Sequence, residues 1–207
     1  MFLMKSYAQR EVSSAQRPII CTEQRFAFNQ EITLCLDEKR SFSGDDFAIK
    51  DQNGVSYFKC KGKTFSIRDK KVIYDLYDKP IFNIQENAFF GHGQKIYSGK
   101  STDEILGSVH RVSMLKKNKY QLSFRNLATG QEEVLDIKCD FIGNSCGIFC
   151  GKEKEGAPMI CRIIKSKKLA SLISDRDHYK ITIAPNVDAA LMVALTIIYD
   201  ELKHEEE

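Results

Sequence analysis

The chain has 207 residues, 43% of them hydrophobic and 29% charged, and its formal net charge is +3. This length fits one large all-β domain or two small domains, and the composition is that of a globular protein with a sizeable core. A net charge of +3 is too small to indicate a nucleic-acid-binding domain, which is usually strongly basic, so we expect no nucleic-acid partner.

The N-terminal residues do not resemble a targeting signal. The apolar run Met1–Met4 has Lys5 after it rather than before it, unlike a secretory signal, and Phe2 stands where myristoylation requires glycine. The chain has seven cysteines, an odd number, and lacks an N-x-S/T sequon. We therefore expect a cytoplasmic protein whose thiols serve as small apolar groups.

Residues 1–17 are polar and show no periodicity, so we predict a flexible N-terminal arm there. From about Pro18 onward, apolar residues recur at every second position, which predicts strands with one buried and one solvated face. Clear examples centre on Phe65 and Ile67, on Tyr120, Leu122 and Phe124, on Leu135, Ile137 and Cys139, and on Tyr179, Ile181 and Ile183.

Turn sequences separate these patterns and give roughly a dozen strands, at the spacing of a sandwich or barrel. They are Gln52-Asn53-Gly54, Asp78-Lys79-Pro80, Gly91-His92-Gly93, Ala128-Thr129-Gly130 and Glu155-Gly156-Ala157-Pro158. No linker-like segment divides the chain, so we predict a single domain over residues 18–207.

The last apolar segment differs from the rest, because Ala189 to Tyr199 is apolar on every side of a helix. It is shorter than the roughly 20 apolar residues of a membrane span, so we expect no transmembrane segment. A helix of this kind must be buried all round. We predict a helix over about 187–202, roughly 24 Å long, a length that suits the axis of a closed barrel. Asn186 is the predicted N-cap, with Asp188 in the first turn.

Three segments of this chain resemble the LURP-one-related family. The closing segment from Asp177 to Asp188, which runs into AALMVALTIIYDE, is the most specific. The segment from Phe47 to Gly54, followed by Phe58, resembles the first hairpin of that family. Tyr74-Asp75 with Lys79-Pro80-Ile81 resembles its second hairpin, and the resemblance extends from about Pro18 to Glu201.

The resemblance implies a tubby-like fold, in which twelve antiparallel strands surround a central hydrophobic helix, as in tubby C-terminal domains and phospholipid scramblases. It also implies an association with plant defence responses. This chain departs from the family pattern at Asn186 and Asp78, where glycine is usual, and at Gln94, where tryptophan is usual. Asparagine also visits left-handed conformations, so we expect Asn186 to be tolerated.

The residues do not favour catalysis or a metal site. Cys139, Cys146, Cys150 and Cys161 cluster in sequence, but Cys146 and Cys150 would lie about 13 Å apart along one strand, too far to share a zinc ion. His92, His110 and His178 accompany no nucleophile signature, and Asp175 and Asp177 are typical turn residues. We therefore expect no enzyme activity, no metal and no cofactor.

Basic segments are the strongest functional signal. We predict that two of them contact anionic phospholipid or phosphoinositide headgroups; their residues are Lys116, Lys117 and Lys119, and Arg162, Lys165, Lys167 and Lys168. Lysine-rich hairpin tips also serve solubility, which is the competing interpretation.

Three functions stay open at this point. The first is a monomeric, non-enzymatic domain that binds lipid headgroups at the membrane periphery, or a protein partner, through its basic outer surface. The second is a protein-interaction scaffold with no lipid role. The third, less favoured because the apolar helix is short, is scramblase-like lipid transport.

Overall fold

The computed structural model describes residues 7–41, 44–62, 71–86, 93–113, 118–142, 144–167 and 177–206. In these residues twelve antiparallel strands form a closed barrel, as predicted, and each strand pairs with its neighbours in sequence while β1 closes against β12. The strands are β1 (Ile32–Ser41), β2 (Gly44–Asp51), β3 (Ser56–Gly62), β4 (Lys71–Tyr74), β5 (Pro80–Glu86), β6 (Gln94–Ser98), β7 (Ile105–Arg111), β8 (Lys119–Asn126), β9 (Gln131–Asp140), β10 (Ser145–Phe149), β11 (Met159–Lys167) and β12 (Asp177–Ile183).

Alternation along the strands builds the core. In β8 the side chains of Tyr120, Leu122 and Phe124 are buried, while Gln121 and Ser123 between them are partly exposed. The predicted strands around Leu135 and Ile181 are likewise present as β9 and β12. The strand expected around Phe65 and Ile67 lies outside the described residues.

One helix, α1 (Ala189–Glu206), packs against the inner face of the barrel. Every residue from Ala189 to Tyr199 is at most 2% exposed, including Thr196, the one polar residue in this run. Strands therefore cover the helix on all sides, which confirms the expected burial. Among the described residues, no helix is both long enough and apolar enough to cross a membrane.

The helix starts later than predicted, at Ala189, and its N-cap is Asp188 rather than Asn186. Asp188 Oδ1 accepts the backbone N–H of Leu191 at 3.1 Å, which is the usual bond from an N-cap side chain to the third helical residue. Asn186 instead has a left-handed backbone with φ of 60°. Its backbone N–H and carbonyl bond to Phe28 and Ile19, so it forms the turn that leads into the cap.

Asp188 also anchors the chain segment that crosses the barrel end at the start of α1. Its Oδ2 accepts the backbone N–H of Cys21 at 3.0 Å, and both the N–H and the hydroxyl of Thr22, at 2.7 and 2.8 Å. A short helix, η1 (Gln24–Phe26), follows and places the Phe26 ring against Phe58. One buried carboxylate thus joins the beginning of the domain to its last helix.

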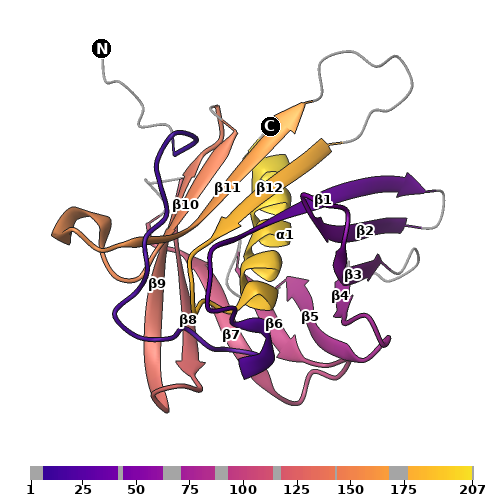
Figure 1. Ribbon diagram of the computed structural model, residues 1–207, viewed down its shortest axis with the longest axis horizontal. Coiled ribbons are helices and arrows are strands. Elements are labelled where there is room, and N and C mark those ends of the chain that lie inside the picture. The colour runs from indigo at the N-terminus through magenta and orange to yellow at the C-terminus, as the bar shows by residue number, and fades with distance from the viewer. Residues whose placement is uncertain are drawn as a thin grey trace.

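Residues 7–17, part of the segment 1–17 where we predicted a flexible arm, lie along the outside of the barrel (Figure 1). The Tyr7 backbone N–H donates to Ser145 Oγ at 3.1 Å, and the Ser13 N–H donates to the Met159 carbonyl at 2.8 Å. Tyr7 packs with Phe149 and Met159 in a small apolar cluster on the outer face. We call residues 7–13 the strap. Residues 1–6 lie outside the described residues.

Candidate functional site

A pocket of about 280 Å³ lies on the outer face of β8 and β9, beside the loop that carries the short helix η2 (Glu153–Glu155). Four lysines and three carboxylates line it, so its formal charge is +1. The lining residues are Val112, Lys119, Gln121, Asp136, Lys138, Lys152, Glu153, Lys154 and Glu155.

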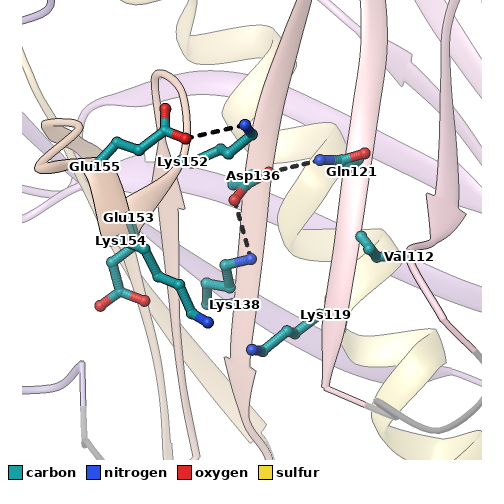
Figure 2. A pocket seen from close by; sticks show the side chains of 9 residues that line it. All are labelled: Val112, Lys119, Gln121, Asp136, Lys138, Lys152, Glu153, Lys154 and Glu155. Atoms are coloured by element: carbon teal, nitrogen blue, oxygen red, sulfur yellow. Dashed lines mark hydrogen bonds and ion pairs between the residues drawn. The ribbon is translucent and has the colours of Figure 1, made fainter.

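Two lysines face each other at the base of the pocket. Lys119 on β8 stands directly opposite Lys138 on β9 in the strand register. Both side chains point outward because Tyr120 and Ile137, the next residues along, point into the core. Figure 2 shows the Lys119 and Lys154 side chains extending toward one another, and the Lys138 amino group turned to Asp136. Like charges directly opposite one another destabilise a sheet, and Asp136 offsets one of these two charges by pairing with Lys138.

The carboxylates of the pocket are engaged by partners. Asp136 accepts a hydrogen bond from Gln121 Nε2 at 2.8 Å and pairs with Lys138 Nζ at 3.0 Å. Glu155 pairs with Lys152 at 3.0 Å, and this hydrogen bond raises the pKa of Lys152. These contacts hold two lysines in place without cancelling the excess of positive charge.

Glu153 is bound from outside the pocket, by the strap. Arg10 Nη1 lies 2.7 Å from Glu153 Oε1, and the Tyr7 hydroxyl donates to Oε2 at 3.4 Å. Burial, followed by the negative charge of Glu153, raises the pKa of Tyr7, so its hydroxyl remains a donor. With Arg10 counted, the positive charges around the pocket exceed the negative ones by two.

The structure separates the basic residues that the sequence grouped together. Lys119, which we predicted from the sequence as a lipid contact, lines the pocket. Arg162 lies on the outer face of β11, where its guanidinium donates to the Arg10 carbonyl at 2.7 Å and so holds the strap. Lys167 ends β11, but its side chain is not among the described ones. The predicted contacts Lys116, Lys117 and Lys168 lie wholly outside the described residues.

Lys165 requires a correction, because its side chain points into the barrel. It shares the inner face of β11 with Cys161 and Ile163, its side chain is 3% exposed, and its Nζ lies 3.0 Å from Asp200 Oδ1. Sequence proximity grouped it with Arg162, but two residues separated by an odd number of positions on a strand face opposite sides. Lys165 therefore lies outside any surface contact set.

Sequence reasoning missed Lys138, Lys152 and Lys154. Alternation alone could have marked Lys138 as outward-facing, between the inward-facing residues Ile137 and Cys139. Lys152 and Lys154 occupy a loop whose sequence pattern does not indicate its position over β9. Strand pairing and loop placement bring these residues to Lys119.

Of the four clustered cysteines, Cys139, Cys146 and Cys161 belong to the interior, and Cys150 is partly buried. Cys139 and Cys146 are cross-strand neighbours on β9 and β10 with Sγ atoms 3.8 Å apart, and both are buried. Burial raises the pKa of Cys139 and of Cys161, so these thiols stay protonated and weakly nucleophilic. Within the described residues, no group of three His, Cys, Asp or Glu side chains is arranged to hold a metal ion.

Comparison with known proteins gives a consistent result. Residues 32–200 match the profile of the family described as LURP-one-related. The Arabidopsis thaliana protein LURP-one-related 10 is 32% identical over 166 residues, which cover 78% of this chain and 84% of that protein. LURP-one-related 15 from the same plant is 27% identical over 170 residues, covering 80% of this chain and 77% of the relative.

The fold has a solved counterpart. An X-ray structure of an Arabidopsis thaliana protein superimposes with a TM-score of 0.64 at 22% identity, covering 88% of this chain and 98% of the other. This likeness concerns the fold alone, whereas the profile spans all twelve strands and α1 as far as Asp200. The chain belongs to the LURP-one-related family.

Proposed function

We propose that this protein is a non-catalytic binding domain that holds the anionic headgroup of a membrane phospholipid in the pocket on β8 and β9. The observation that carries the proposal is the opposition of Lys119 and Lys138 across the two strands, with the Lys154 side chain extending toward Lys119. A phosphate placed among these lysines would add negative charge where positive charge is in excess and would gain charge-assisted contacts.

The position of the pocket supports a surface ligand. The pocket opens on the outside of the barrel, so a headgroup can enter without any change in the core. Each near-surface lysine contributes about 1 kcal/mol of attraction to an anionic membrane, so a few of them give reversible, salt-dependent association. We place the protein at the cytoplasmic surface of membranes, as a peripheral monomer.

A protein partner is the second candidate. The turn between β4 and β5 presents Tyr77 at 88% exposure beside Leu76 at 46%, and exposed aromatic groups are typical of protein interfaces. Lipid transport by an inserted helix has weaker support, because the apolar side chains of α1 are already buried against the barrel strands.

Co-sedimentation with vesicles tests the lipid proposal. Vesicles of phosphatidylcholine alone, and with added phosphatidylserine or phosphatidylinositol bisphosphate, are compared at low and at raised salt. We expect binding to the anionic vesicles only, and we expect Lys119→Glu and Lys154→Glu each to weaken it by about thirty-fold, because each reversal removes one attraction and adds one repulsion, each of about 1 kcal/mol.

Lys180→Glu is the matched control, since Lys180 is an exposed lysine on β12 and its reversal changes the net charge equally. Soluble inositol trisphosphate distinguishes a headgroup site from general attraction to a charged surface, because a headgroup site also binds the soluble probe. Absence of wild-type binding to every anionic vesicle at low salt, or an equal loss in the Lys180 variant, refutes the pocket as a lipid site.

A further inference from the structure

The strap and the pocket share one residue, Glu153. Its carboxylate accepts from Arg10 and Tyr7 of the strap, while its neighbours in sequence, Lys152 and Lys154, line the pocket together with Glu153 itself. In Figure 2 the Lys154 side chain extends toward Lys138 and Lys119, and the Glu153 carboxylate ends on the other side of it. The strap therefore supplies both of these partners of the Glu153 carboxylate.

The strap is held by contacts that are individually modest. Arg10 is 42% exposed, and its pair with Glu153 is a surface ion pair. Its guanidinium also lies 4.9 Å from the centre of the Phe149 ring, and Tyr7 packs edge-on against the same ring at 6.0 Å. Because exposed ion pairs and single ring contacts are weak, the strap can lift while the barrel stays folded.

A glycine provides the space for the strap. A Cβ on Gly147 would lie 3.0 Å from Tyr7 Cδ1 and 2.9 Å from Met159 Sδ, so only glycine lets the Tyr7 ring sit flush on β10. The Arg162 guanidinium, bound to the Arg10 carbonyl, fixes the backbone at the point where the Arg10 side chain turns toward Glu153. The strap is thus positioned to bring a cation to the pocket rim.

We propose that the strap regulates the anion affinity of the pocket through Glu153, an inference that rests on the proposed function. With the strap docked, Arg10 offsets the charge of Glu153, and the pocket lysines act on the anion. With the strap lifted, the Glu153 carboxylate is left beside Lys154 and competes with the anion for it. Because coupling between two binding events is reciprocal, an anion in the pocket stabilises the docked strap.

A double-mutant cycle on Arg10 and Glu153 tests this coupling. Soluble inositol trisphosphate and vesicles containing phosphatidylinositol bisphosphate serve as probes for wild type, Arg10→Gln, Glu153→Gln and the double variant. We expect Arg10→Gln to weaken binding by about two- to five-fold, the range of an exposed ion pair. We expect the double variant to bind as tightly as Glu153→Gln, because Arg10 acts only by occupying that carboxylate.

Hydrogen exchange gives a second readout that does not depend on measured affinity. The N–H groups of Tyr7 and Ser13 are bonded to β10 and β11 residues, so they report docking of the strap. We expect the soluble probe to slow their exchange in the wild type and not in Glu153→Gln. Arg25→Gln is the control, since Arg25 is 44% exposed, pairs with Glu23 and Asp75, and does not line the pocket.

The outcomes separate this inference from the proposed function. If the wild type binds the probe, and Arg10→Gln weakens binding equally with Glu153 present and with Glu153→Gln, then Arg10 acts on the anion independently. That result overturns the coupling. Wild-type binding with unchanged exchange in the strap overturns it as well. If the wild type binds neither probe, the proposed function fails and the coupling falls with it.

Discussion

Lys165 and Asp200 form an ion pair inside the barrel, with Nζ 3.0 Å from Oδ1 and side chains only 3% and 4% exposed. The Tyr179 hydroxyl also donates to Asp200, and Lys165 Nζ lies 5.2 Å from the centre of the Tyr179 ring. These contacts tie α1 to β11 and β12, so a lysine that sequence proximity assigned to the membrane is part of the core.

We expect Asp200→Asn to destabilise the fold by about 3–5 kcal/mol, because it leaves the Lys165 ammonium buried without a countercharge. The double variant Lys165→Met with Asp200→Asn should recover part of this loss, since it removes both charges. Urea denaturation followed by circular dichroism measures both effects. Folded Lys165→Met should bind vesicles as the wild type does, and a loss of binding at full folding would place Lys165 at the surface after all.

Asp188→Ala should cost at least about 3 kcal/mol of stability. The N-cap bond to Leu191 contributes about 1 kcal/mol, and the Cys21 and Thr22 donors lose their buried acceptor at about 1–3 kcal/mol each. Asp51→Ala is the matched control, because Asp51 accepts two backbone N–H groups in an exposed turn. Equal destabilisation of the two variants in a denaturant titration would contradict the anchoring role of Asp188.

Glu133 should make stability depend on acid pH. Burial by itself raises the pKa of Glu133, but hydrogen bonds from Arg17 and Asn126 and the charge of Arg17 outweigh it, and the folded-state pKa is lowered below 4.5. At pH values near 4.5 the unfolded chain binds more protons than the folded chain. The stability that Glu133 contributes is therefore present above pH 4.5 and is lost as the pH falls through the folded-state pKa.

Glu133→Gln tests this sign. At neutral pH we expect it to be less stable than the wild type by about 1–3 kcal/mol, the range for a hydrogen bond to a charged group. The difference should shrink as the pH falls below 4.5. Denaturant titrations of both proteins from neutral pH to about pH 3 measure it, and a gap that stays constant or widens on acidification contradicts the assignment.

Asn186 has a φ of 60°, a backbone conformation that glycine adopts without strain, which fits the glycine that the family resemblance implies at this position. Asn186→Gly should therefore change stability by less than about 0.5 kcal/mol, whereas Asn186→Ala should cost about 1–2 kcal/mol, because alanine has no side-chain bond that favours the left-handed region. Asp78, with a φ of 61°, provides a second test at the other departure from the family pattern. Equal stability of the glycine and alanine variants would show that backbone conformation does not select these residues.

Local patterns in the sequence predicted several elements of this fold. The alternation Tyr120, Leu122, Phe124 predicted β8 and its buried face, because neighbouring side chains on a strand point to opposite sides. The apolar run from Ala189 to Tyr199 predicted a helix buried on every side, since no polar stripe is left to face water. The family signature added the strand number and the closure of the barrel.

The candidate site was decided only by the tertiary structure. Lys119 and Lys138 meet because β8 pairs with β9 in one particular register, and Lys154 joins them from a loop after β10. Lys165 is buried although Arg162 nearby is not, since the side of the sheet, and not the distance in sequence, determines exposure. The strap likewise docks through contacts with residues far along the chain, which no local pattern encodes. Periodicity is a property of one segment, whereas a site requires several segments to be placed together.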